Sequence, residues 1–259
     1  MIANNNGVRI GWEEHGTGDP VLLIQGLGYA RWGWRPLIGL LAGHFRVITF
    51  DNRGIGDSSI PPGPYTAAEM ATDALAVLDA AGVGSAYIIG TSLGGMIAQE
   101  IAIDHEARVA KLVLICTTPG GTQAHPIPEA TLQLIAEAPS LPPEVSLRKF
   151  VVNALGKDPD PDLIETIFEF RMANPPDPTG WGAQAIAGAT YSAGERVSRI
   201  SAPTLLIAGT SDRVIDHRNS ELLRDIIPDA TLNLVPDAGH LVFWEHPELV
   251  ASTIIDFLQ

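Results

Sequence analysis

Short apolar runs alternate with amphipathic patterns of helical period through most of this chain. The runs are four to six residues long and nearly continuous, as expected of parallel strands that helices cover on both faces. They lie at Val21–Ile24, Arg46–Phe50, Ala86–Ile89, Lys111–Cys116, Thr204–Ile207 and Thr231–Val235. Strands separated in this way by helices are joined by right-handed crossovers. The pattern therefore predicts an α/β fold with a mostly parallel central sheet flanked by helices.

The helical pattern is clearest in Thr66–Ala81, Gly94–His105, His217–Ile227 and Pro247–Leu258. The first of these segments opens with Thr66-Ala67-Ala68-Glu69, which predicts a capping box. It is followed by Gly82, a residue that commonly ends a helix.

The alternation of strand and helix stops between Thr117 and Ile200. These 84 residues hold 11 of the 20 prolines of the chain. They contain short amphipathic segments near 129–138, 144–155, 161–173 and 180–189 and no convincing strand. We interpret residues 118–199 as a helical cap, or lid, inserted into an α/β core formed by residues 1–117 and 200–259.

Composition excludes several classes of protein. The chain has 30 acidic and 16 basic side chains, and this charge balance is the opposite of what nucleic acids or anionic membranes attract. A hydrophobic content of 46% is too high for a disordered chain. No apolar run approaches the roughly 18 residues of a membrane helix, and no signal peptide is visible. We expect a soluble, cytoplasmic protein with neither nucleic-acid nor membrane partners.

The segment Gly90-Thr91-Ser92-Leu93-Gly94 matches the pattern G-x-S-x-G of a nucleophile elbow. An elbow is a sharp turn from strand to helix that exposes a serine hydroxyl, and the flanking glycines let the neighbouring chain segments pass closely. Here the pattern directly follows an apolar strand and opens a helical segment, which is the context the elbow requires. The sequence therefore predicts Ser92 as a catalytic nucleophile.

A serine hydroxyl needs a base that takes its proton and an acid that orients the base. In an elbow architecture the acid and then the histidine follow the serine along the chain. Asp212 comes just after the strand Thr204–Ile207, and His240 just after the strand Thr231–Val235. Because α/β sheets place their sites beyond the carboxyl ends of parallel strands, we predict Asp212 and His240 as the partners of Ser92.

The other acids and histidines fit these roles less well than this pair. Asp216 is the rival acid, but its position favours a cap for the helix near His217. An acid after the preceding core strand is a further arrangement, but Thr117-Thr118-Pro119 offers none. His217 is expected in a helix and His246 at a helix start, so both are expected at the surface. The remaining histidines precede Asp212 in the chain: His15, His44, His105 and His125.

Acyl transfer also requires hydrogen-bond donors for the oxyanion that develops on the substrate. The first is the backbone N–H of Leu93, the residue after the nucleophile. The second is expected from the loop Gln25-Gly26-Leu27-Gly28, which follows the strand Val21–Ile24. We nominate the N–H of Leu27; the alternative is an ordinary glycine turn.

With these motifs the chain resembles the α/β-hydrolase fold superfamily, in the capped branch that holds esterases, enol-lactonases, cofactor-free haloperoxidases and carbon–carbon hydrolases. The resemblance covers nearly the whole chain and is weakest in the cap. It is carried by Gln25–Gly28, Asp51–Ser58, Gly90–Gly95, Gly209–Asp212 and Gly239-His240. The resemblance implies that the loop Asp51–Ser58 is mainly architectural and that the cap determines which substrate is accepted.

Departures from the family patterns narrow the expected activity. Serine rather than aspartate at position 92 argues against epoxide hydrolases and haloalkane dehalogenases, and neither the tryptophan nor the doubled glycine of proline iminopeptidases is present. Leu241 stands where ring-cleavage carbon–carbon hydrolases usually carry tryptophan, and Leu93 where haloperoxidase-like members carry methionine. Gln25 replaces the usual histidine before the oxyanion loop, which puts the bracing of that loop in doubt.

A substrate pocket beneath the cap is expected to be mostly apolar. For each candidate, ordinary core packing is the alternative. The candidates are Leu27, Trp32, Trp34, Leu93, Val214, Leu241 and Val242 from the core, with Phe168, Met172 and Trp181 from the cap. Arg148, Lys149 and Arg171 are the cap cations that could receive a substrate carboxylate, although each is more simply a solvated surface residue.

We therefore expect a Ser-His-Asp hydrolase that cleaves a small or medium, largely apolar carboxylic ester or lactone. No cofactor and no metal are expected, because no metal cluster, phosphate loop or dinucleotide fingerprint is present in the sequence. Two alternatives stay open: a carbon–carbon hydrolase with the same triad, and a ligand receptor that turns over slowly. The protein is expected to act on a small molecule as a monomer or homodimer.

Overall fold

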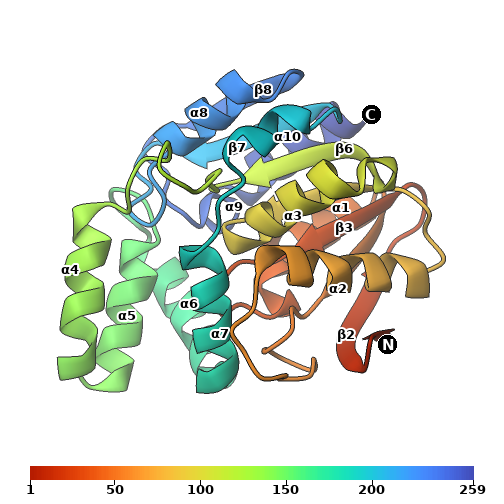
Figure 1. The fold of residues 1–259 in the computed structure, drawn as a ribbon. Helices are drawn as coiled ribbons and strands as arrows, with labels where there is room; N and C mark the ends of the chain where they lie inside the picture. The colour runs from red at the N-terminus through yellow and green to blue at the C-terminus, as the bar shows by residue number, and fades with distance from the viewer.

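The computed structural model describes all 259 residues and contains one eight-stranded sheet flanked by helices (Figure 1). The strand order is β1-β2-β4-β3-β5-β6-β7-β8. β3 to β8 are parallel to one another, and β1 and β2 run antiparallel at one edge. The strands are β1 (Ile2–Asn5), β2 (Val8–His15), β3 (Pro20–Ile24), β4 (Arg46–Phe50), β5 (Ala86–Thr91), β6 (Val109–Ile115), β7 (Thr204–Gly209) and β8 (Ala230–Val235). This architecture is the predicted α/β fold; the two antiparallel edge strands were not predicted.

Helices cover both faces of the sheet because alternate residues of each central strand point to opposite sides. In β3, Leu22 and Ile24 belong to the apolar core shared with α2 (Ala67–Ala80), α3 (Leu93–Asp104) and α8 (Arg218–Ile226). Val21 and Leu23 belong to the core on the other face, shared with α1 (Arg35–Ala42), α9 (Val242–Glu245) and α10 (Pro247–Leu258). The parallel strands β3 to β7 are thus largely buried on both sides, which explains their nearly continuous apolar sequences, whereas the edge strand β8 is mostly half-buried.

Helix boundaries lie close to those that the sequence predicts. The capping box of α2 is confirmed: the Thr66 side chain accepts the Glu69 N–H at 3.1 Å, and the Glu69 carboxylate accepts the Thr66 N–H at 3.0 Å. α10 has the predicted bounds, and α3 and α8 differ from theirs by one residue at each end. Short 3₁₀ helices lie at Arg31–Trp34, Glu106–Arg108, Ala138–Ser140 and Gly194–Arg199. None of the helices combines the length and the apolar character needed to cross a membrane.

Four helices lie between β6 and β7 and gather beside one another at one side of the sheet (Figure 1). They are α4 (Glu129–Glu137), α5 (Pro143–Asn153), α6 (Pro161–Ala173) and α7 (Pro178–Ala189), called here the inserted helices. They are bonded to loops that follow parallel strands. Thr131 of α4 donates to the carbonyl of Arg213 beyond β7, and Gln184 of α7 accepts the N–H of Gly28 beyond β3. The inserted helices therefore lie over the carboxyl ends of the strands.

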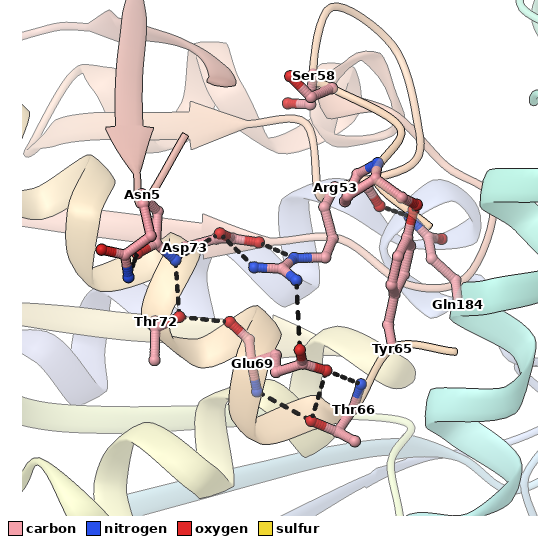
Figure 2. A network of polar contacts seen from close by, with 12 residues as sticks. Asn5, Arg53, Ser58, Tyr65, Thr66, Glu69, Thr72, Asp73 and Gln184 are labelled. Carbon is pink, nitrogen blue, oxygen red and sulfur yellow. Dashed lines mark hydrogen bonds and ion pairs between the residues drawn. The ribbon is translucent and has the colours of Figure 1, made fainter. Parts of the chain in front are cut away.

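A buried ion pair fixes the loop after β4 to helix α2 (Figure 2). The Arg53 guanidinium donates to both carboxylate oxygens of Asp73, at 2.6 and 2.9 Å. Asp73 is only 1% exposed, and it also accepts a bond from the Asn5 side chain at 2.8 Å. Such two-pronged pairs between arginine and carboxylate constrain geometry as well as adding energy. The loop 51–58 is thereby held in one position relative to the core.

Substituting Asp73 by alanine is expected to destabilise the fold by about 3–5 kcal/mol. The buried Arg53 guanidinium would lose both short hydrogen bonds to Asp73 and keep only the exposed Glu69 carboxylate at 3.8 Å. The matched control is Asp79→Ala on the same helix, whose partner Arg108 binds it at 2.7 Å at the surface; that change is expected to cost about 0–1 kcal/mol. Urea denaturation of both variants measures the difference. Equal midpoints for the two variants would contradict the role given to the Arg53–Asp73 pair.

Candidate active site

Ser92 lies at the junction of β5 and α3 with a backbone conformation that is unusual for a residue with a side chain. Its φ is +55° and its ψ is −123°, outside the regions that L-residues ordinarily occupy. Tight packing holds the turn in place, because a Cβ on Gly90 would overlap the carbonyl of Gly94, and one on Gly94 would overlap that of Ile24. The flanking glycines therefore serve the close passage that the pattern predicts.

Asp212 and His240 meet through their side chains. The Asp212 Oδ2 lies 2.8 Å from the His240 Nδ1, and both residues are about 7% exposed. The other carboxylate oxygen, Oδ1, accepts the N–H groups of Val214 at 2.7 Å and Ile215 at 2.9 Å. Since an ionised carboxylate can only accept, the Nδ1 hydrogen lies on the Asp212 side. The imidazole is thus oriented with Nε2 left to exchange a proton.

The end of β6 brings Ser92 and this pair together. The Ser92 N–H donates to the carbonyl of Ile115 at 2.9 Å, and Cys116 is the next residue. The Cys116 Sγ, a carboxylate oxygen of Asp212 and a ring nitrogen of His240 all lie within 4.8 Å of one another. Burial, and then the neighbouring Asp212 carboxylate, raise the pKa of the Cys116 thiol well above its usual value. A cysteine binds a metal only as the thiolate, and the raised pKa disfavours that form. The arrangement of the three residues therefore favours a histidine oriented by Asp212 over a metal site.

Cys116 is expected to be unreactive in the folded protein. The thiol is buried and its pKa is raised, and only the thiolate attacks disulfide reagents. A thiol titration with Ellman's reagent should release no thionitrobenzoate from the native protein at pH 8 and one equivalent after denaturation in guanidinium chloride. Rapid labelling of the native protein would contradict the burial and the raised pKa.

The rival residues make no hydrogen bond or ion pair with Asp212 or His240. Asp216 accepts the backbone N–H of Arg218 at 3.0 Å, at the start of α8, and pairs with the Arg218 guanidinium. Hydrogen bonding from the Arg218 side chain is the main reason why the pKa of Asp216 falls to about 2. His217 lies at the N-terminus of α8, and the exposed His246 at that of α10.

In the segment Gly26–Tyr29 of the loop after β3, one N–H has no acceptor in the protein. The N–H of Gly26 donates to Gln25 Oε1 at 2.9 Å, that of Gly28 to Gln184 Oε1 at 3.1 Å, and that of Tyr29 to the carbonyl of Gly26 at 3.4 Å. Leu27 makes no such bond. Leu93 is the first residue of α3, where no carbonyl of the helix can accept its N–H. These are the two donors nominated from the sequence.

Gln25 braces this loop in place of the family's usual histidine. Its side-chain oxygen accepts the Gly26 N–H, and its main-chain carbonyl accepts the Asn52 side-chain NH₂ at 2.9 Å. The residue is 2% exposed. The glutamine side chain thus supports the loop by accepting the Gly26 N–H, and the main-chain carbonyl, which any residue at this position would supply, joins it to the loop after β4.

The predicted pocket residues of the core occupy different surroundings. Trp34 is completely buried with its ring against Phe243, 4.9 Å between centroids, so it packs in the interior. Trp32 is half-buried, and Leu93, Leu241 and Val242 are buried. Leu27 and Val214 are half-buried.

The candidates from the inserted helices are more exposed than predicted for a pocket. Met172 and Trp181 are 43% and 42% exposed. Phe168 lies under the Arg148 guanidinium, 4.1 Å from its ring centre, and Arg148 in turn pairs with Glu165. Lys149 pairs with Glu137 at 2.8 Å on the surface. Arg171 instead reaches inward and donates to the carbonyl of Gly28 at 3.2 Å.

An aromatic cluster that the sequence reasoning missed joins the inserted helices to the core. Phe170 of α6 stacks on Trp32, with 5.5 Å between centroids and 15° between planes, and lies 6.1 Å from Trp244. The helical period offered a signal for it, because Ile167 is buried and Phe170 follows it by three residues, whereas Phe168 falls on another side of α6.

A cavity of about 520 Å³ opens beside the loop of Asp212. It is lined by polar and charged residues and one proline: Pro128, Lys157, Thr210, Ser211, Asp212, Arg213, Asp216, His217 and Arg218. Neither Ser92 nor His240 is among them. This polar hollow therefore differs from the apolar pocket that the sequence predicts over the serine.

Comparison with known proteins agrees with the fold. The family model of the alpha/beta hydrolase fold matches residues 19–247. A protein of Mycobacterium tuberculosis provisionally named a non-heme bromoperoxidase is 30% identical over 96% of this chain and 97% of its own. A poly(3-hydroxyalkanoate) depolymerase of Ectopseudomonas oleovorans is 31% identical, over 93% and 84%. The thermophilic esterase of Thermogutta terrifontis superposes with a TM-score of 0.84 at 28% identity, over 100% and 97%. The chain belongs to the α/β-hydrolase fold family.

Proposed function

We propose that this protein is a serine hydrolase that cleaves a small or medium, largely apolar carboxylic ester or lactone through an acyl-enzyme. The observation that carries the proposal is the 2.8 Å contact between Asp212 and His240. Two backbone N–H groups fix the Asp212 carboxylate, and the strained turn at Ser92 supplies the nucleophile. The similarity to an esterase and to a depolymerase, over nearly the whole chain, also supports hydrolysis.

The reaction begins with proton transfer from the Ser92 hydroxyl to the His240 Nε2 as the Ser92 Oγ attacks the substrate carbonyl. The N–H groups of Leu27 and Leu93 stabilise the oxyanion of the tetrahedral intermediate. Asp212 holds the tautomer of the imidazole and stabilises the imidazolium that forms. No metal or cofactor takes part in these steps.

The intermediate collapses when the bond between the former carbonyl carbon and the oxygen of the alcohol breaks. The alcohol leaves with the proton from His240. Water then attacks the acyl-enzyme as it gives a proton to the same nitrogen. The second tetrahedral intermediate breaks its bond to the Ser92 Oγ, which takes that proton back from His240, and the carboxylic acid is released. A lactone follows the same course, except that its alcohol stays attached to the acyl group. In this proposal residues 118–199 act as the cap that selects the substrate.

Hydrolysis of p-nitrophenyl acetate, butyrate and octanoate, followed by rapid mixing, tests the proposed function. The expected result is a burst of one p-nitrophenol per active site, followed by sustained turnover, with a preference that reports the length of the acyl pocket. A stoichiometric burst that then stalls would contradict the proposal and favour a slow ligand receptor. Turnover of a diketone without turnover of any ester would favour a carbon–carbon hydrolase.

A further inference from the structure

We propose that Gln184 and Arg171 are positioning residues that hold the oxyanion loop from the side of the inserted helices. This inference rests on the proposed function, because it gives the loop 25–28 a role in stabilising an oxyanion. It adds that the loop is held in place by residues outside the core.

Both backbone polar groups of Gly28 are hydrogen-bonded to side chains of the inserted helices. Its N–H donates to the Gln184 Oε1 at 3.1 Å, and its carbonyl accepts the Arg171 guanidinium at 3.2 Å. Its φ of +70° suits glycine, and a Cβ there would lie 2.7 Å from the indole of Trp181. Side chains from α6 and α7 thus fix the orientation of both peptide units next to Gly28.

Gln184 is itself held in one orientation. It is 1% exposed, and its Nε2 donates to the carbonyl of Arg53 at 2.8 Å (Figure 2). Its Oε1 accepts the N–H of Gly28. The side-chain amide therefore bridges an acceptor and a donor, and turning it over would break both bonds. Arg53 cannot follow such a movement, because its guanidinium is bound to Asp73. Gly28 is thus connected to helix α2 through Gln184, Arg53 and Asp73.

The backbone of α7 lies directly against the loop 51–58, which contains Arg53. A Cβ on Gly180 would overlap the carbonyl of Gly54, so no side chain separates the helix from the loop 51–58 at this point. Arg171 is also stacked on the ring of Tyr29, 4.5 Å from its centre. Gln184 is therefore anchored outside the oxyanion loop through Arg53, whereas Arg171 contacts that loop at two neighbouring residues, Gly28 and Tyr29.

The Leu27 N–H belongs to the peptide unit between Gly26 and Leu27, and the carbonyl of that unit accepts the Tyr29 N–H at 3.4 Å. The Tyr29 N–H in turn shares a peptide unit with the Gly28 carbonyl, which Arg171 binds. The bonds to Gly28 therefore hold the two peptide units that follow Leu27, and through the Tyr29–Gly26 bond they constrain the direction of the Leu27 N–H. Displacements of about 1 Å can reduce catalysis by about a hundredfold. Loss of the bonds to Gly28 should consequently affect the transition state more than the binding of the substrate.

The first test compares Gln184→Met, which keeps the length of the side chain and removes both of its hydrogen bonds, with Gln133→Met, a control at an exposed position of α4. We expect Gln184→Met to lower kcat for p-nitrophenyl butyrate by about 10- to 100-fold, with KM nearly unchanged. The affinity for butylboronic acid, whose adduct with Ser92 places an oxygen at the oxyanion position, should fall by the same factor. Gln133→Met should behave as wild type.

The second test needs no activity. Hydrogen exchange of the Gly28 amide, followed by NMR, should be slow in the wild type and in Gln133→Met and faster in Gln184→Met. Gln184→Glu keeps an acceptor for this amide, so its exchange should lie closer to that of the wild type. If Gln184→Met fails to fold, Arg171→Met provides the same comparison of kcat with boronate affinity.

The outcomes separate this inference from the proposed function. Unchanged exchange at Gly28 in a folded Gln184→Met variant would overturn the contact. Faster exchange with unchanged kcat and boronate affinity would overturn its role in positioning the oxyanion loop. A wild type without ester turnover would overturn the proposed function, and the exchange comparison would still decide whether Gln184 holds Gly28.

Discussion

Ser92→Ala is expected to lower kcat for p-nitrophenyl butyrate by about four to six decades. The variant loses the only atom that can form the acyl-enzyme, while the N–H groups of Leu27 and Leu93 remain to give residual stabilisation. The burst of p-nitrophenol should disappear completely. Rapid-mixing and steady-state assays of both proteins measure these two effects.

Ser198→Ala is the matched control for that substitution. Ser198 is exposed and its hydroxyl only donates to the nearby carbonyl of Glu195, so the variant should keep the activity of the wild type. A Ser92→Ala rate within tenfold of the wild type would remove Ser92 from the mechanism.

Asp212→Asn is expected to reduce kcat by about four decades with little change in folding. The side-chain oxygen of an asparagine would still accept the N–H groups of Val214 and Ile215, which would direct the new amide NH₂ toward the His240 Nδ1. The histidine would then present a lone pair to that amide and carry its hydrogen on Nε2, where it could no longer take the proton of Ser92. Steady-state kinetics and thermal denaturation together measure this result.

Asp216→Asn is the control for that change, because Asp216 is on the same loop and bound to Arg218 rather than to His240. Its activity should stay near that of the wild type. The reverse order of effects, a large loss with Asp216→Asn and a small one with Asp212→Asn, would exchange the roles of the two acids.

The parallel part of the fold was predictable because burial on both faces leaves a direct mark on the sequence. Each of the six parallel strands falls on a predicted apolar run, and Thr66 and Glu69 mark the start of α2. The hairpin of β1 and β2 was missed because its strands mix polar and apolar residues. A signal was present: Asn6-Gly7 adopts φ values of +50° and +90°, and this dipeptide favours tight hairpin turns.

The candidate site was predictable where it depends on the ends of strands, and not where it depends on how the inserted helices dock. Ser92, Asp212 and His240 follow strands, so the order of the chain places them. Gln184 is the one large polar residue on the buried side of α7, beside Gly180, Ala183 and Ala187. That pattern indicates a buried bond, but its partners come from loops more than a hundred residues earlier in the chain.

The contact between Gly54 and Gly180 limits how substrate preference can be redesigned. Because two backbones touch there without side chains, any larger residue at either position forces α7 away from the core and carries Gln184 with it. Libraries aimed at new substrates should therefore leave both glycines unchanged. Variation is better placed at exposed positions such as Met172 and Ile186, where a change in side-chain size leaves the contact between Gly54 and Gly180 intact.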